Sequence, residues 1–456
     1  MKLKKLTLSN FRGFEHFECE FQENINVLVG LNGYGKSSVL DAISIAYGQF
    51  ISGFETGLDK GVHDDDIHLA KHSTQDGIFE RFSMESQFPV EVQAEAFSSA
   101  IDLFPQSWER SRKTRKGRTT QVKKLKDCAK DLQQRVQQKQ TKEQSPTDLP
   151  LLSYYGTGRL WKHKKLTSNK AESANKSSRL EGYRDCLDPE SSYAAFSHWL
   201  RNETIADHER RMQIIEESGL SDAVVTGTTF RSTLLAAITT AVNKVLEPSG
   251  WSYVRYSATT KQITATHKVQ GHVPVSMLSD GVRNMIGMIA DIAYRAIRLN
   301  PHFGQDAVIK TQGIVLIDEV DMHLHPEWQQ LVLQNLSEAF PNIQFIVTTH
   351  SPQVLSSVKK ESILLLGDNA QITPVIGDTY GTSSGDILTE IMGVNPKPRL
   401  DWVIELEKYS ALIDLGLHTS DEGNELRASL EERLGAEHDG LQKADRKIRR
   451  KGLLSS

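Results

Sequence analysis

The sequence has few cysteines and no long apolar run. Its 456 residues contain three widely separated cysteines, Cys19, Cys128 and Cys186. This small, odd number excludes a disulfide framework and a cysteine-based zinc site, and it fits a reducing compartment. No run approaches the roughly 18 apolar residues of a membrane span, and the basic N-terminus lacks the apolar core of a secretion signal. We therefore expect a cytoplasmic protein with no membrane partner.

A strong net charge is also absent. The formal charge is −4, with 25% charged and 38% hydrophobic residues, which is typical of a globular chain and argues against a general polyanion binder. The charge is uneven, because residues 108–142 contain 13 Lys or Arg against three Asp or Glu, and residues 443–451 contain six basic residues and one acidic residue. Such a run is most often a solvated face; the alternatives are a nucleic-acid surface and a docking site for an acidic partner.

The apolar pattern at both ends of the chain indicates an α/β protein. Near the N-terminus, residues 25–29 form a β-branched run that ends at a glycine, and helical spacing follows in residues 39–46. Farther along, residues 314–317 are fully apolar and residues 343–347 are apolar except at Gln344, which indicates central parallel strands. The helical pattern between them, residues 327–339, completes a predicted β-α-β unit.

The first motif is a glycine loop between the predicted strand and helix. It reads G-x-x-x-x-G-K-S, and such a loop turns its backbone N–H groups toward phosphate oxygens at the N-terminus of a helix. Lys36 is expected to neutralise the β- and γ-phosphates, and Ser37 to bind Mg²⁺. The predicted nucleotide contacts here are Gly30, Leu31, Asn32, Gly33, Tyr34, Gly35, Lys36, Ser37 and Ser38.

Two more motifs follow the predicted C-terminal strands. Asp318 and Glu319 come directly after the first, at the sheet edge where parallel α/β proteins bind ligands. We expect Asp318 to hold Mg²⁺ and Glu319 to polarise the attacking water as general base. His350 follows the second strand and is predicted to sense the γ-phosphate; Lys36, Glu319 and His350 are thus the predicted catalytic residues.

A fourth motif, Leu278-Ser279-Asp280-Gly281-Val282-Arg283, precedes a predicted helix at residues 285–297. It resembles the LSGGQ signature of ABC ATPases, with Asp280 in place of the usual second glycine. This resemblance implies that Ser279 and Gly281 bind the γ-phosphate of a nucleotide held by a second subunit, so that two subunits form a nucleotide-sandwich dimer.

With Phe11-Arg12-Gly13-Phe14 after the first strand, the motifs resemble the RecF/SMC/OLD-like branch of ABC ATPases over residues 1–95 and 275–365. The resemblance implies an ABC-type P-loop ATPase head with a mixed sheet, a short helical or coiled-coil insertion and a small helical C-terminal region. ATP and Mg²⁺ are the implied cofactors. Arg12 would lie near the nucleotide, and Asp321 would belong to the D-loop at the dimer interface.

Two features remain open within this resemblance. The glutamine of the family's Q-loop has no clear position; the candidates are Gln75, Gln87 and Gln93, and Asp66 is a further acidic candidate near the site. His323 and His325 suggest a metal site, but Pro326 and the helix after it favour a structural loop.

We expect five regions along the chain. The ATPase is split between its N-terminal half and a C-terminal half with the signature, the carboxylate pair and the histidine switch. A basic insertion with about two heptads of apolar spacing and a mixed helix and strand region lie between them, and a helical region follows. In chain order these regions are 1–100, 101–148, 149–270, 271–367 and 368–456.

The short insertion differs from the long coiled coils of chromosome-organising SMC proteins. Residues 151–161, together with the pattern around Tyr380-Gly381 and Ile391-Met392-Gly393, are similar to the PtuA family, the ATPases of the Septu anti-phage system. That resemblance implies a slow ATPase that controls or scaffolds a partner HNH endonuclease, in assemblies as large as a trimer of dimers, with DNA as a further candidate partner.

Three alternatives differ in class. One is a RecF-like repair ATPase without a dedicated nuclease, which the neighbouring gene would distinguish. Another is a nuclease of the OLD type, but its Toprim domain needs an Asp-x-Asp motif that the residues after His350 lack. The third is an ATP-bound clamp with negligible turnover, against which the intact Glu319 argues.

Overall fold

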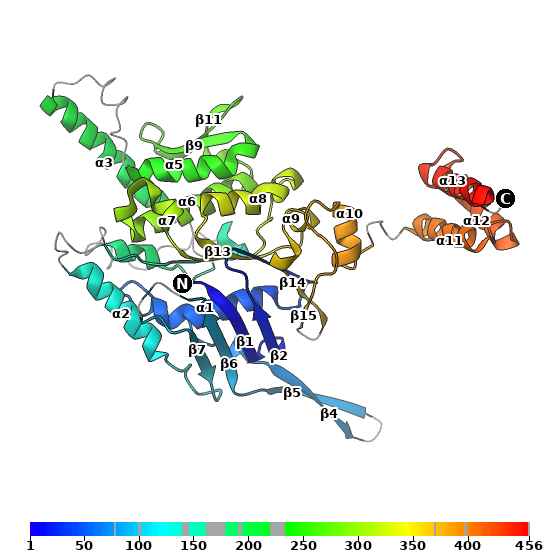
Figure 1. The fold of residues 1–456 in the computed structure, drawn as a ribbon, viewed down its shortest axis with the longest axis horizontal. Coiled ribbons are helices and arrows are strands. Elements are labelled where there is room, and N and C mark those ends of the chain that lie inside the picture. The colour runs from blue at the N-terminus through cyan, green and yellow to red at the C-terminus, as the bar shows by residue number, and fades with distance from the viewer. Residues whose placement is uncertain are drawn as a thin grey trace. The chain divides into compact units, whose positions relative to one another are not determined.

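The computed structural model describes residues 1–76, 79–98, 101, 103–138, 146–160, 178–189, 194–218, 233–368, 371–395, 398 and 400–454 (Figure 1). The chain divides into two compact units, Met1–Ile387 and Leu388–Ser456. In the part that the structure describes, no helix is both long and apolar enough to cross a membrane. Residues 162–185 are rich in basic residues and serine, which predicts a loop, and they lie mainly outside the described residues.

An antiparallel sheet forms the first layer of the larger unit, with the strand order β2-β1-β6-β7. Alternate side chains of β1, such as Leu6 and Leu8, are fully buried, as the two-residue period requires. The bounds are β1 Leu3–Phe11, β2 Phe14–Glu20, β6 Val90–Ala96 and β7 Ser107–Arg112.

Strand β7 lies inside the predicted insertion 101–148, so the basic stretch begins within the sheet. Arg110 is fully buried, and its guanidinium donates to the carbonyl of Ile45 at 2.8 Å and to the Asp59 carboxylate at 3.0 Å. The strand was not predicted because an arginine occupies an inward position that normally holds an apolar residue.

The central sheet has six strands in the order β15-β14-β3-β13-β12-β8. Its β8, β12, β13, β3 and β14 are parallel, and β15 is an antiparallel edge strand. This confirms the predicted parallel strands and mixed sheet. The bounds are β3 Ile25–Val29, β8 Leu151–Tyr155, β12 Gly313–Ile317, β13 Ile343–Thr348, β14 Ile363–Leu366 and β15 Ile372–Thr373.

Helices cover the sheets and connect their strands. Helix α1, Lys36–Ile51, follows β3, and α8, Pro326–Ala339, connects β12 to β13 as predicted. The predicted apolar helix is α6, Asp280–Leu299. The predicted two-heptad seam lies on α2, Lys123–Gln137, which packs on α1: a Cβ on Gly53 would lie 2.5 Å from that of Ala129.

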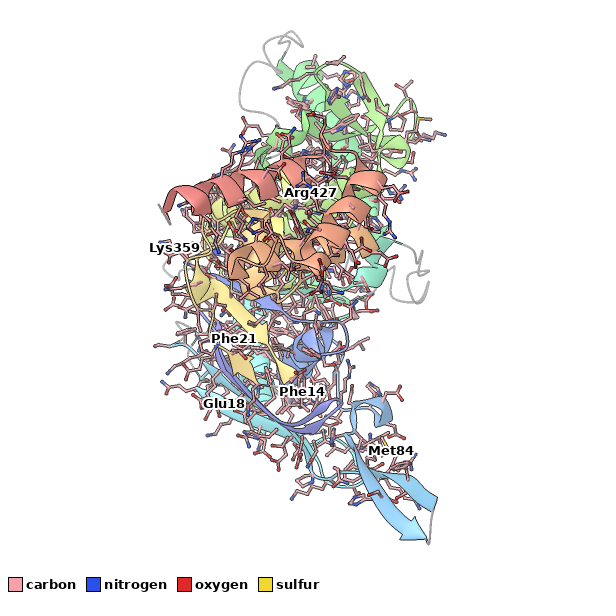
Figure 2. All side chains as sticks on the ribbon, turned by 90° about the vertical axis from the view of Figure 1, so that its right-hand side faces the viewer. Phe14, Glu18, Phe21, Met84, Lys359 and Arg427 are labelled. Carbon is pink, nitrogen blue, oxygen red and sulfur yellow. The ribbon has the colours of Figure 1, made fainter. Side chains whose placement is uncertain are left out.

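The rest of the larger unit consists of further helices and two small sheets. A three-stranded sheet has the order β11-β10-β9, and the hairpin of β4 and β5 projects from the body with Met84 exposed (Figures 1 and 2). The bounds are α3 Ala194–Ser218, α5 Thr233–Leu246, α7 Ala307–Lys310, α9 Pro352–Leu355, α10 Ser384–Asp386, β4 Leu69–Asp76, β5 Phe79–Ser86, β9 Trp251–Ser257, β10 Gln262–His267 and β11 Gly271–Pro274.

The smaller unit contains three helices, α11 Asp401–Leu415, α12 Asp421–Leu434 and α13 Asp439–Leu454. Ile413, Leu430 and Leu441 are fully buried at its centre. This unit begins later than the predicted boundary at residue 368. The residues between 368 and the start of this unit belong to the larger unit. Strand β15 pairs with β14, and the Thr379 hydroxyl donates to the Val358 carbonyl at 2.6 Å.

Candidate nucleotide site

The phosphate loop depends on its glycines. Gly33 and Gly35 have φ angles of 87° and 92°, in the left-handed region that favours glycine. A Cβ on Gly35 would also lie 2.4 Å from Cζ of Phe14. Residues 31–33 are exposed, which leaves the outer side of the loop open to a ligand. The loop thus has the backbone that the motif predicted, at the N-terminus of α1.

Lys36 lies inside this loop. Its ammonium group donates to the carbonyls of Gly30 at 2.9 Å and Leu31 at 3.1 Å. Burial lowers the pKa of Lys36, and the carboxylates of Asp318 and Glu319 oppose that shift. The positive charge of Lys36 therefore already lies within the phosphate loop, near the carboxylates of Asp318 and Glu319.

The two predicted magnesium ligands are adjacent. The Ser37 hydroxyl donates to Asp318 Oδ2 at 2.8 Å. A hydroxyl and a carboxylate oxygen are ligands that Mg²⁺ prefers, with water and phosphate oxygens completing its octahedron. The residues therefore fit this ion, which Ser37 and Asp318 would hold between the loop and the carboxylate pair.

Thr348, which the sequence did not single out, holds the acidic pair in place. Its hydroxyl donates to Asp318 Oδ1 at 2.6 Å and accepts the backbone N–H of Glu319 at 2.8 Å. Glu319 has a φ of 49°, unusual for a side chain with a Cβ. The hydroxyl of Thr348 thus fixes one carboxylate oxygen and the turn that carries the next carboxylate.

His350 stands between two anchored neighbours. The Thr349 hydroxyl donates to Asp321 Oδ1 at 2.5 Å, and the Ser351 hydroxyl donates to Gln329 Oε1 at 2.8 Å. The Gln329 amide in turn donates to the carbonyl of Leu324 at 3.0 Å. These bonds join the predicted switch to the predicted D-loop. The sequence did not predict roles for Thr349, Ser351 and Gln329, because each acts through a hydrogen bond to a residue on another element.

One of the two histidines after Asp321 caps a helix. His325 is the N-cap of α8, and its ring accepts the N–H of Glu327 at 3.4 Å. Among the described residues, no three His, Cys, Asp or Glu side chains lie close enough together to hold a metal ion. The capping bond of His325 fits the predicted structural loop.

Arg12 is engaged by two carboxylates. It binds Asp41 at 2.7 Å and Asp66 at 2.8 Å, and Lys60 binds the other oxygen of Asp41 at 2.9 Å. Burial disfavours the charged guanidinium, but Asp41 and Asp66 outweigh it, so the pKa of Arg12 is raised. Asp66 therefore lies beside a predicted nucleotide contact and acts on it.

The glutamine candidates for the Q-loop give no assignment. The Gln87 amide donates to the Glu85 carbonyl at 3.0 Å, and the Gln93 amide donates to Glu109 at 3.2 Å. Neither bond reaches the phosphate loop. The side chain of Gln75 lies outside the described residues.

The signature motif is built around a tight contact with the D-loop. Ser279 is the N-cap of α6, and its side chain makes no capping hydrogen bond. A Cβ on Gly281 would lie 2.1 Å from the His323 carbonyl oxygen, so this position requires glycine for packing within the subunit. Asp280 forms an ion pair with Arg283 at 2.5 Å. In the described part of the chain, no hydrogen bond joins Ser279 to the phosphate loop of its own subunit.

A cleft of about 740 Å³ lies beside the phosphate loop. Gly33, Tyr34, Phe14, His68 and Asp368 are among the residues that line it. Its lining does not include Lys36, Ser37 or Asp318, so the cleft lies next to the phosphate site and does not enclose it.

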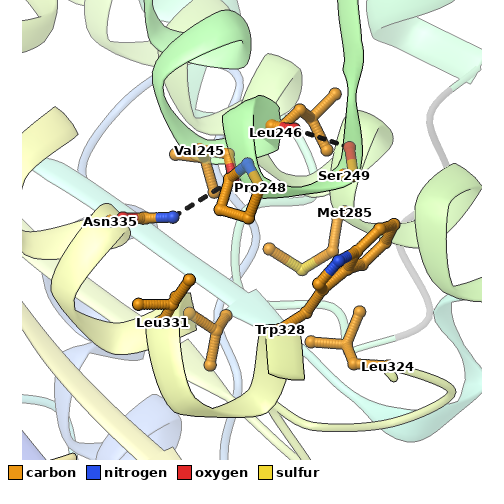
Figure 3. A pocket seen from close by; sticks show the side chains of 10 residues that line it. Val245, Leu246, Pro248, Ser249, Met285, Leu324, Trp328, Leu331 and Asn335 are labelled. Atoms are coloured by element: carbon orange, nitrogen blue, oxygen red, sulfur yellow. Dashed lines mark hydrogen bonds between the residues drawn. The ribbon is translucent and has the colours of Figure 1, made fainter. Parts of the chain in front are cut away.

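A second cavity lies between α6 and α8, where Met285 and Trp328 face the same space (Figure 3). It holds about 20 Å³, room for no more than one water, and apolar side chains dominate its lining. It is a packing gap within the larger unit.

The chain is similar in sequence to known ATPases. A family model described as "AAA domain" matches residues 5–214, and one described as "AAA ATPase domain" matches residues 206–355. The retron Vc95 probable ATPase of Vibrio cholerae is 24% identical over 91% of this chain and 84% of its own length. The Septu protein PtuA of Bacillus thuringiensis is 32% identical over 32% of this chain and 38% of its own length. These matches support an ABC-type ATPase of the SMC- and RecF-like kind, similar to PtuA and the retron ATPases.

The extent of these matches differs. The retron Ec83 probable ATPase of Escherichia coli is 37% identical, but the match covers 37% of this chain and 30% of that relative. The chain thus matches well under half of the Ec83 and PtuA relatives, and most of the Vc95 relative. The SMC head domain of Thermotoga maritima matches 83% of this chain and 100% of its own at 16% identity, with a TM-score of 0.42.

Proposed function

We propose that this protein is the ATP-binding and ATP-hydrolysing regulatory subunit of an anti-phage defence complex, in which it controls or scaffolds a partner HNH endonuclease that degrades DNA. The observation that carries the ATPase part is the meeting of Ser37 and Asp318 beside Lys36. The similarity to PtuA and to two retron ATPases supports the defence role.

The chemistry proposed for the site uses residues already in place. Lys36 and the N-terminus of α1 bind the phosphates, and Ser37 and Asp318 hold Mg²⁺, which supplies positive charge to the γ-phosphate. Glu319 orients and polarises the attacking water, and His350 responds to the γ-phosphate. Slow turnover suits a regulatory role, because the bound state then lasts long enough to control a partner.

The proposed working unit is a dimer, because Ser279 and Gly281 of one subunit would close over the nucleotide of the other. ATP then favours the closed dimer, and loss of the γ-phosphate favours its opening, which makes nucleotide state a switch for assembly. Larger assemblies, such as a trimer of dimers, can be built from this unit. DNA is a further proposed partner of the complex.

Two experiments test the proposal. Purified protein should release phosphate from ATP, and Glu319→Gln should abolish the release while keeping ATP binding. Co-expression with the product of the adjacent gene should yield a stable complex whose DNA cleavage changes with ATP. Cleavage that is indifferent to ATP would contradict the regulatory role.

The alternative is a RecF-like ATPase that acts in DNA repair without a dedicated nuclease. Its support is a match to RecF of Clostridioides difficile, 42% identical over 13% of this chain and 16% of that relative. An adjacent gene that encodes no small HNH protein would favour this alternative.

A further inference from the structure

Tyr155 connects two parts of the larger unit that the motifs place far apart. It is the last residue of β8, and its backbone carbonyl accepts the N–H of Asp318 at 2.8 Å. Its hydroxyl donates to Asp291 Oδ2 on α6 at 2.8 Å. The same residue therefore contacts the backbone of a magnesium ligand and the helix that begins at the signature.

The contact with α6 is buried and charged. Tyr155 and Asp291 are each 3% exposed, and Arg295 is 4% exposed. The Arg295 guanidinium donates to the same Asp291 oxygen at 2.8 Å, and to the carbonyls of Gly182 and Arg184 at 2.9 and 3.0 Å. Moving α6 against β8 would separate a carboxylate from its partners away from water, which is strongly unfavourable. The two elements are thus held to one relative position.

The helix carries this restraint to the signature. Asp291 follows Ser279 by three turns of α6, roughly 18 Å along an α-helix at 1.5 Å per residue. At the other end, the D-loop packs against Gly281 so closely that a Cβ would not fit. A force on Ser279 therefore reaches Asp291 through a continuous helix.

We propose that Tyr155 is a positioning residue that couples the two nucleotide sites of the dimer. This inference rests on the proposed function, because it takes Ser279 to bind the nucleotide of the partner subunit. Engagement of Ser279 sets the position of α6, the hydroxyl of Tyr155 follows Asp291, and its carbonyl sets the backbone of Asp318. Each subunit's magnesium site is then completed when its own signature has closed on the partner's nucleotide.

The test is phosphate release by the full chain as a function of ATP concentration. The wild type should show a Hill coefficient above one, with two as the limit for two sites. Tyr155→Phe removes only the hydroxyl, and its Hill coefficient should fall to one. Binding of a fluorescent ATP analogue to dilute monomer should stay within twofold of the wild type, since no atom of the phosphate loop changes.

Tyr183→Phe is the matched control. Tyr183 is fully buried, and its hydroxyl donates to the Pro150 carbonyl at 2.8 Å instead of to α6. This variant should keep the wild-type Hill coefficient. If Tyr155→Phe does not fold, Asp291→Asn, which removes the charge that holds the hydroxyl, is measured in the same way and should also give a coefficient of one.

The outcomes separate the two proposals. A wild type that releases no phosphate contradicts the proposed function itself. A wild type that hydrolyses ATP without cooperativity, or a Tyr155→Phe variant as cooperative as the wild type, overturns the coupling alone. Equal loss of cooperativity in Tyr183→Phe would also overturn it, because the effect would then follow from any buried hydroxyl.

Discussion

The Ser37 hydroxyl donates a 2.8 Å hydrogen bond to Asp318, although 281 residues separate them in the chain. The two lie side by side because β3 and β12 are parallel strands on either side of β13, so that the loops after them emerge at one sheet edge. Ser37 and Asp318 are the residues that would hold a magnesium ion, and the ion would supply positive charge beside the phosphates.

Lys36→Ala should weaken ATP binding by ten- to a hundredfold. Hydrogen bonds to charged groups are worth about 1.5–3 kcal/mol, which corresponds to this range. The measurement is titration with a fluorescent ATP analogue. Lys4→Ala, at an exposed position of β1, serves as the control and should bind normally. Equal affinities of the two variants would remove Lys36 from the site.

Gly35→Ala should both destabilise the protein and abolish ATP binding. The new Cβ would meet Phe14 at 2.4 Å, in a backbone conformation that itself costs roughly 1–3 kcal/mol for other residues. Gly33→Ala is the matched control, because its φ is similar but its Cβ would have no neighbour within 4 Å. Thermal melting should rank the wild type first, Gly33→Ala second and Gly35→Ala last; the reverse order of the two variants would show that the clash is relieved elsewhere.

Thr348→Val should raise the Mg²⁺ concentration needed for half-maximal phosphate release by about tenfold, the effect of one hydrogen bond to a charged group. The variant keeps the shape of the side chain but loses the hydrogen bonds that the hydroxyl makes with Asp318 Oδ1 and with the Glu319 N–H. Thr349→Val, which loses a bond to Asp321 instead, should leave the magnesium requirement unchanged. A normal magnesium requirement in Thr348→Val would mean that the acidic pair needs no such support.

As the pH rises, ATP affinity should begin to decline at a lower pH than it would if the pKa of Lys36 were that of an ordinary lysine. Burial lowers the pKa of Lys36 from 10.5, so the free protein loses this charge below pH 10.5. For the same reason, the unfolded chain holds the proton more tightly, and the contribution of Lys36 to the free energy of unfolding rises with pH between the lowered pKa and 10.5.

Binding measured against pH in wild type and Lys36→Arg checks this. Arginine stays charged throughout the range, so the variant should lack the alkaline decline, whatever its absolute affinity. Parallel pH profiles for the two proteins would assign the decline to another group.

Local patterns were sufficient for much of the fold. The strands at 25–29, 314–317 and 343–347 were predicted because buried parallel strands are predominantly apolar, although Asn26 and Gln344 are buried polar positions within them. Strand β7 was not, since Arg110 faces inward and is satisfied by Asp59 and by backbone carbonyls from α1 and the loop after it. In a sequence, a charged residue predicts an exposed position, and only the identity of its partners shows that it can be buried.

The predicted site shows the same division. The order of motifs along the chain predicted which groups would gather at the sheet edge, because a glycine loop and a carboxylate pair can each be recognised from a few adjacent residues. Thr348, Gln329 and Asp66 were not given definite roles, because threonine, glutamine and aspartate are common at surfaces and only their partners make these three distinctive.

The sequence by itself determined the phosphate loop, the carboxylate pair and the central strands, since each depends on residues that are neighbours in the chain. Only the tertiary structure decided what joins them: the bond from Ser37 to Asp318, the pairing of Arg12 with Asp41 and Asp66, and the link from Tyr155 to Asp291. The physical reason is tertiary packing: the strand order places β3, β13, β12 and β8 side by side, and the partners that meet are between 29 and 281 residues apart in the chain.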